Sequence, residues 1–95
     1  MENRIIISGI GSVSRLSGNK YGQSVYTEQI EPKFDESCKN VLVFPNSIEW
    51  VAISFIEGML SKLPNEIPRK DFFKFFSVEG KDSVINKFFD VVMMG

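Results

Sequence analysis

The stretch VLVFPNSIEWVAISFIEGML, residues 41–60, decides the fold class of this chain. It begins with the apolar run Val41 to Phe44, which is typical of a buried strand. Pro45-Asn46 follows as a turn signal. Apolar side chains at helical spacing then predict a helix from Phe55 to Leu63. A buried strand that leads through a short loop into an amphipathic helix indicates an α/β domain.

Elements of the same kind flank this stretch on both sides. Upstream, the β-branched run Ile5-Ile6-Ile7 predicts a strand buried on both faces, and a weaker helix is expected from Ser14 to Ile30. Downstream, Phe72 to Val78 predicts a third strand, and apolar spacing predicts a last helix from Asp82 to Met93. The β-α-β-α-β-α order favours one α/β domain over residues 1–95, with a small mixed or parallel sheet packed by helices.

Two glycines interrupt the expected first helix. Gly18 and Gly22 are four residues apart, a spacing that places both on one side of a helix. Each weakens the helix by about 1 kcal/mol relative to alanine. A neighbouring backbone that approaches this side closely would explain why glycine is tolerated there.

Composition and charge argue against several classes of function. Eleven basic residues against twelve acidic ones give a net charge of −1, whereas a nucleic-acid-binding domain usually shows a basic excess. The chain has no histidine, so it lacks the commonest general base and metal ligand. Cys38 is its one cysteine, and only Lys or Arg is present to lower the pKa of that thiol. We therefore expect no catalytic residue, no metal and no cofactor.

The sequence gives no sign of a membrane or export signal. The apolar run after Met1-Glu2-Asn3-Arg4 is too short for the core of a signal peptide. No segment approaches the roughly 20 apolar residues that span a bilayer. A lone cysteine fits a reducing compartment. We expect a cytoplasmic protein that binds no membrane.

Ser54 is the centre of the candidate site. Ser54 and Glu57 have the spacing of a capping box, in which the serine begins the helix and the glutamate reaches back to it. A helix N-terminus also favours added negative charge, which makes the same serine a candidate for phosphorylation or partner contact. The structural and the functional role are compatible, and the sequence leaves both open.

Three further residues are candidates for partner binding. Trp50 is the one tryptophan of the chain; packing in the core is its ordinary role, but tryptophan is also enriched at binding hot spots. Glu49 precedes it, and Arg15, near the start of the first predicted helix, can pair with an acidic partner. Lys87 is expected on the polar face of the last helix, away from these residues.

Three short motifs carry a resemblance to a known family. The first is Gly11-Ser12-Val13-Ser14-Arg15-Leu16-Ser17-Gly18. The second is the strand Val41 to Phe44, followed by Ile48-Glu49 and by Ile53 to Glu57. The third is the strand-helix ending, Phe72 to Val78 and then Ser83 to Val92. In these motifs the chain resembles, over most of its length, the small bacterial STAS-like domains of unassigned function.

The resemblance implies a non-enzymatic regulatory module that binds another protein, of the ATPase or kinase-type regulator class. STAS domains of the anti-sigma-factor-antagonist type carry a phosphorylatable serine where a loop enters a helix. Ser54 falls at that place, although Ile53 and Phe55 flank it here instead of the family's usual aspartate and small residues. Partner contact is then expected at the end of the sheet where Gly11 to Arg15 and Pro45 to Ser54 converge.

Two alternatives remain open at this level. A phage or mobile-element protein that inhibits a host or defence complex would use the same face. A small nucleotide-binding protein would use Gly9 and Gly11 as a phosphate loop, but the segment lacks the third glycine of a dinucleotide fingerprint and the Gly-Lys-Ser/Thr of a P-loop. The sequence does not decide whether the chain forms a homodimer.

Overall fold

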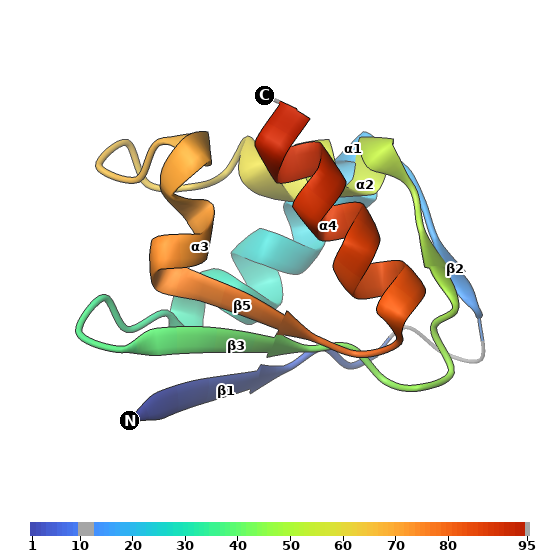
Figure 1. Cartoon of the computed structure of the whole chain (residues 1–95), viewed down its shortest axis with the longest axis horizontal. Helices are drawn as coiled ribbons and strands as arrows, with labels where there is room; N and C mark the ends of the chain where they lie inside the picture. Colours follow the sequence, from blue (N-terminus) through green and yellow to red (C-terminus); the bar gives the residue numbers. More distant parts are fainter. Residues whose placement is uncertain (10–12, 95) are drawn as a thin grey trace.

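Three parallel strands form the main sheet of the computed structural model, which describes residues 1–9 and 13–94. The strands are β1 (Glu2–Ile6), β3 (Lys39–Val43) and β5 (Phe76–Glu79), in the spatial order β1-β3-β5 (Figure 1). Parallel neighbours cannot be joined by a hairpin, so each connection crosses over a face of the sheet and carries helices. The small α/β domain with a parallel sheet that the sequence predicted is therefore confirmed.

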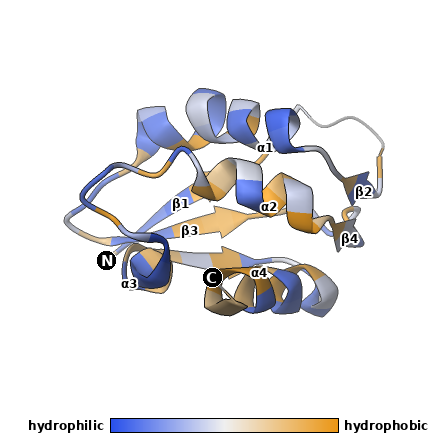
Figure 2. Ribbon diagram, turned by 90° about the horizontal axis from the view of Figure 1, so that it is seen from above, coloured by the Kyte–Doolittle hydropathy of each residue, from blue (hydrophilic) through white to orange (hydrophobic). Residues whose placement is uncertain are grey.

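All the helices shown lie on one face of this sheet, with α4 in front of α1 and α2 in Figure 1. Seen from above in Figure 2, α2 lies between α1 and α4. The core between the helices and the sheet contains large, fully buried side chains from both layers, among them Ile5, Leu42, Phe55, Phe76 and Phe88. The helical elements are α1 (Asn19–Val25), the π-helix η1 (Tyr26–Ile30), the 3-10 turns η2 (Glu31–Lys33) and η3 (Arg69–Asp71), α2 (Ile53–Leu60), α3 (Phe72–Phe75) and α4 (Asp82–Met94).

The other face of the sheet exposes Ile6 of the first strand to solvent, so the prediction that this strand is buried on both faces is wrong. Ile6 is 60% exposed, whereas Ile5 and Ile7 are buried. An ion pair crosses this face, since Arg4 of β1 donates two hydrogen bonds of 2.8 Å to Glu79 of β5. The hydrogen bond from Arg4 lowers the pKa of Glu79, so the ion pair persists to a lower pH than it would with an ordinary glutamate. These two long side chains span the middle strand where a second helical layer would otherwise lie.

Helices α1 and α2 cross at two glycines. A Cβ on Gly22 would overlap the carbonyl oxygen of Phe55 and lie 2.9 Å from its carbonyl carbon. A Cβ on Gly58 would overlap the carbonyl of Asn19 in the same way. The close backbone approach that the sequence predicted is thus present at Gly22, and Gly58 is its counterpart on α2. Gly18 lies outside the helix, with a φ of 99° that favours glycine.

A buried amide ties the amino-terminal ends of the strands together. Asn40 of β3 is fully buried. Its side-chain oxygen accepts from the N–H of Asp35 at 2.9 Å and from the amide of Asn3 at 2.8 Å. Its Nδ2 donates to the carbonyls of Asp35, Cys38 and Phe75, at 2.8, 3.1 and 3.1 Å. One side chain therefore fixes the loop before β3, strand β1 and the end of α3.

Two elements differ from the prediction. Residues 72–75 form helix α3 where the start of a strand was predicted, and β5 begins only at Phe76. Phe72 stacks on Phe76, with ring centroids 4.8 Å apart, at the i, i+4 spacing of a helix. The helix predicted from Ser14 begins instead at Asn19, because Arg15–Leu16 pairs as a short strand.

The remaining elements agree with the prediction more closely. Strand β3 and helix α4 were placed to within two residues at each end. Helix α2 begins at Ile53 and ends at Leu60, earlier than predicted at both ends. In the described ranges 1–9 and 13–94, none of the helices has the length and apolar character needed to cross a membrane.

Candidate functional site

A short two-stranded ribbon lies beyond the carboxyl ends of the main strands (Figure 1). Its strands are β2 (Arg15–Leu16) and β4 (Trp50–Val51), which pair in parallel. The N–H of Glu49 donates to the carbonyl of Ser14 at 2.7 Å and extends the pairing. The ribbon therefore joins the segments around Arg15 and Trp50, which the sequence predicted to converge. Gly11 and Ser12, at the start of the first segment, lie outside the described residues.

Trp50 has two cationic side chains close to its ring. The guanidinium carbon of Arg15 lies 4.7 Å from the ring centroid, and Nζ of Lys87 lies 5.8 Å from it. The register of β2 and β4 places Arg15 opposite Trp50. The hydroxyl of Ser83 donates to the carbonyl of Glu49 at 2.6 Å and so holds the first turn of α4 against the ribbon. Lys87, one turn after Ser83, thereby reaches the indole, and the prediction that it lies away from Trp50 is wrong.

Arg15 and Lys87 take part in none of the ion pairs found among the described residues. The ion pairs found within residues 1–9 and 13–94 join Arg4 to Glu79, Arg69 to Glu57 and Lys74 to Asp71. Arg15 is exposed, and Trp50 and Lys87 are half-buried. Both cations lie within the distance of the indole ring at which cation–π attraction is significant.

Ser54 does not cap α2, so the predicted capping box is wrong. The helix begins two residues earlier than predicted, at Ile53, with Ala52 as its N-cap. The exposed Ser54 hydroxyl instead accepts a 3.1 Å hydrogen bond from the N–H of Gly18, which precedes α1. Ser54 thus links the first turn of α2 to the start of α1, at the inner end of the ribbon.

This bond gives Ser54 a measurable role in stability. Ser54→Ala is expected to lower the free energy of unfolding by about 1 kcal/mol, because the Gly18 N–H loses its acceptor but remains open to water. Ser54→Asp is expected to stay within about 0.5 kcal/mol of the wild type, since a carboxylate can accept the same bond and complements the helix dipole. Urea denaturation measures both. A Ser54→Asp variant that is much less stable than Ser54→Ala would contradict the exposed position of this side chain.

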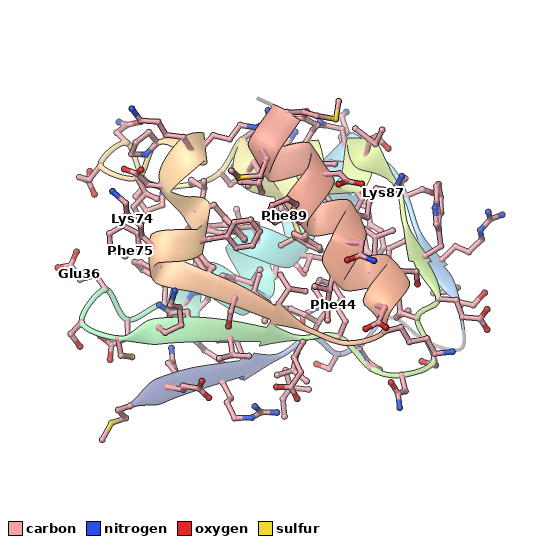
Figure 3. All side chains as sticks on the ribbon, in the orientation of Figure 1. Glu36, Phe44, Lys74, Phe75, Lys87 and Phe89 are labelled. Carbon is pink, nitrogen blue, oxygen red and sulfur yellow. The ribbon has the colours of Figure 1, made fainter. Side chains whose placement is uncertain are left out.

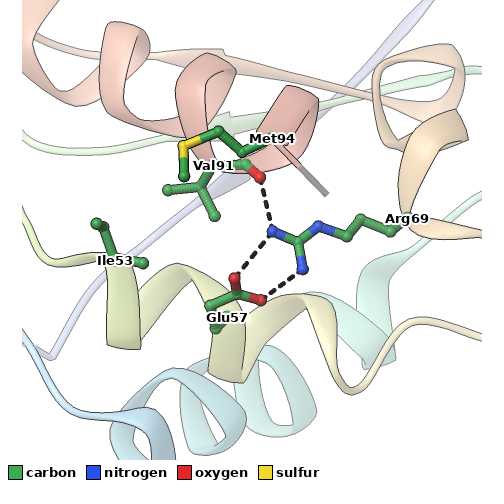
Figure 4. A pocket seen from close by; sticks show the side chains of 5 residues that line it. All are labelled: Ile53, Glu57, Arg69, Val91 and Met94. Atoms are coloured by element: carbon green, nitrogen blue, oxygen red, sulfur yellow. Dashed lines mark hydrogen bonds and ion pairs between the residues drawn. The ribbon is translucent and has the colours of Figure 1, made fainter.

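Glu57, the other half of the predicted capping box, belongs to a different cluster (Figure 4). Arg69 donates to both of its carboxylate oxygens, at 2.7 and 2.9 Å, and also to the carbonyl of Val91 at 2.6 Å. The hydrogen bond to Val91 satisfies a backbone carbonyl in the last turn of α4. These residues line a pocket of about 150 Å³ together with Ile53 and Met94. Because the charges in this pocket already pair with each other, we assign the cluster to the packing of α4 on α2.

The carboxyl-terminal half of α4 exposes apolar side chains. Phe89 is 55% exposed and Met93 is 60% exposed. Phe89 packs on Phe73 of α3, with ring centroids 6.0 Å apart, and lies between α3 and α4 in Figure 3. A pocket of about 160 Å³ opens beside Met93 and is lined also by Arg69, Lys70 and Val92. No motif predicted this apolar surface, because the spacing of Phe89 and Met93 is that of an ordinary core face.

The remaining chemistry-bearing groups do not form a second site. Cys38 lies in the loop before β3, at the opposite end of that strand from the ribbon, and desolvation followed by the charge of Asp35 raises the pKa of its thiol. Residues 1–9 and 13–94 contain no group of three or more Cys, Asp or Glu side chains that could hold a metal ion. Gly11, half of the phosphate loop weighed above, is outside the described residues, and Gly9 has a φ of 69°.

Comparison with protein-family models, with curated proteins and with solved structures finds no match for this chain. The resemblance to STAS-like domains therefore stays a prediction from three short motifs. The geometry of the ribbon is the firmer basis for a function, because it is independent of any family.

Proposed function

We propose that the chain is a non-enzymatic regulatory module of the STAS-like kind, which acts by binding another protein through the ribbon surface. This surface consists of Arg15, Glu49, Trp50 and Ser54. The observation that carries the proposal is the half-buried indole of Trp50, which stands beside the exposed guanidinium of Arg15 at the end of the sheet. Loops at the carboxyl ends of parallel strands are the usual docking place in open α/β sheets.

The surface has the composition of a binding hot spot. Tryptophan and arginine are the residue types most enriched among side chains that dominate binding energy. Glu49 is exposed beside them, and its backbone is held by Ser14 and Ser83. A surface whose backbone is already fixed loses little conformational freedom on binding, which favours affinity.

Ser54 is the proposed point of regulation. It is exposed and lies in the first turn of α2, where added negative charge is favourable. A phosphate on its hydroxyl would compete for the N–H of Gly18 and alter the junction between α1 and α2. Partner binding and phosphorylation would then act on adjacent parts of one surface, as in a switch controlled by a kinase-type regulator.

The proposal is tested with the full chain as bait. A partner captured from the source cells is identified by mass spectrometry, and its affinity for purified variants is measured by calorimetry. Trp50→Ala is expected to weaken binding by at least about 2 kcal/mol. Arg15→Glu and Glu49→Lys are expected to change the association rate and the salt dependence.

Matched controls reverse the same charges at the other end of the molecule. Lys74→Glu and Glu36→Lys alter exposed side chains that lie opposite Lys87 in Figure 3, and both should bind as the wild type does. Circular dichroism confirms that each variant is folded. If Trp50→Ala and Arg15→Glu bind as tightly as these controls, the interface is elsewhere and the proposal fails.

A further inference from the structure

We infer that the partner presents a carboxylate-rich segment to the ribbon surface, with its acidic groups paired to Arg15 and Lys87. This inference rests on the function proposed above and adds the chemistry of the partner. Its starting point is that two cations from distant parts of the chain meet at one indole, 4.7 and 5.8 Å from its centroid. Three elements, β2, β4 and α4, have to be assembled for this to occur.

The way Arg15 is held suits recognition of a carboxylate. A guanidinium has five N–H donors in one plane and binds a carboxylate through two parallel hydrogen bonds. Stacking on an aromatic ring uses the face of the guanidinium and leaves its edge donors free. Lys87 adds a second positive charge on the same indole. An acidic segment can therefore pair with both cations while its apolar atoms pack on Trp50.

The surroundings favour a protein segment over a nucleic acid. The chain as a whole carries a net charge of −1, so it has no general attraction for polyanions. Glu49 is exposed next to Trp50 and would repel a backbone that carries a charge at every nucleotide. A peptide can place its carboxylates at Arg15 and Lys87 and an uncharged residue near Glu49.

Trp50 provides the signal for a direct test, because it is the one tryptophan of the chain. The purified protein is titrated at low salt with a short peptide in which glutamate alternates with glycine, while its tryptophan fluorescence is recorded. We expect a saturable change, and an apparent affinity that falls steeply as salt rises from about 20 to about 200 mM. A polylysine peptide and inorganic phosphate, used as separate probes, should cause no saturable change at the same concentrations.

The variants locate the site of binding. Arg15→Gln and Lys87→Gln are each expected to weaken peptide binding about fivefold to tenfold. Lys74→Gln is the matched control, because Lys74 is exposed, lies on α3 and pairs with Asp71 at 3.5 Å. Its affinity for the peptide should equal that of the wild type.

Several outcomes would overturn the inference. One is the absence of any fluorescence change with the glutamate–glycine peptide, and another is an affinity that neither glutamine variant alters. A third is tighter binding of an oligothymidine than of the peptide, which would indicate a nucleic-acid site. If the peptide fails while the captured partner still depends on Trp50, the acidic partner is excluded and the protein-binding function stands.

Discussion

Gly22→Ala and Gly58→Ala are each expected to destabilise the protein by about 3 kcal/mol or more. In an ordinary helix the same change would stabilise by about 1 kcal/mol, because alanine is the better helix former. The sign is reversed here because a Cβ at Gly22 would overlap the carbonyl oxygen of Phe55, and one at Gly58 that of Asn19. Backbone atoms cannot rotate away, so helices α1 and α2 would have to separate.

Urea denaturation followed by circular dichroism measures this effect. Ser24→Ala is the control, since Ser24 is exposed on the same helix and should change the free energy of unfolding by less than about 0.5 kcal/mol. The double variant should lower the free energy of unfolding by less than the sum of the two single variants, because one separation of the helices relieves both overlaps. A Gly22→Ala protein more stable than the wild type would mean that the helices do not cross here.

Asn40→Leu is expected to lower the free energy of unfolding by about 3 to 5 kcal/mol. Leucine has the same branched skeleton of side-chain heavy atoms, although it is bulkier, and it would leave five polar groups without the partner that Asn40 provides. Three of these are carbonyl oxygens, of Asp35, Cys38 and Phe75, that lie against a fully buried position. An unsatisfied buried polar group costs about 1 to 3 kcal/mol, and part of this cost is recovered if water enters.

The comparison for this prediction is Asn86→Leu, which changes an exposed asparagine on α4. Its stability should remain within about 0.5 kcal/mol of the wild type. Hydrogen exchange adds a second measurement, because the N–H of Asp35 should lose protection in Asn40→Leu. Equal stability of the two leucine variants would show that the network around Asn40 contributes little.

Hydrophobic runs and helical spacing predicted the layout of the fold. Val41 to Phe44 and the apolar face of the last helix gave β3 and α4 to within two residues, because both carry their pattern locally. The segment from Phe72 was misassigned, since phenylalanine occurs readily in both strands and helices. Phe72 of α3 stacks on Phe76 of β5, a contact between two elements that the run of phenylalanines does not reveal.

The candidate site was predicted in part. The approach of Arg15 to Trp50 followed from expecting their segments at the same end of the sheet, and the structure places them in one ribbon. The role of Lys87 was missed, because periodicity gives the side of a helix but not the element opposite it. The prediction of a capping box failed for a related reason. The N–H of Ala52 donates to the carbonyl of Leu16 in the ribbon, and helix α2 begins directly after Ala52.

The parallel order of the main strands has a consequence for folding kinetics. Glu2 pairs with Lys39 and Asn40 with Phe76, so each strand pairing closes a long loop that contains a helical segment. The crossing of Gly22 with Gly58 closes a loop of similar length. The entropy of these closures has to be overcome before the contacts form, which slows folding relative to a helical bundle of equal size. The sheet has no hairpin from which folding can start, and refolding is expected to wait for α1 to meet α2 or for β1 to meet β3.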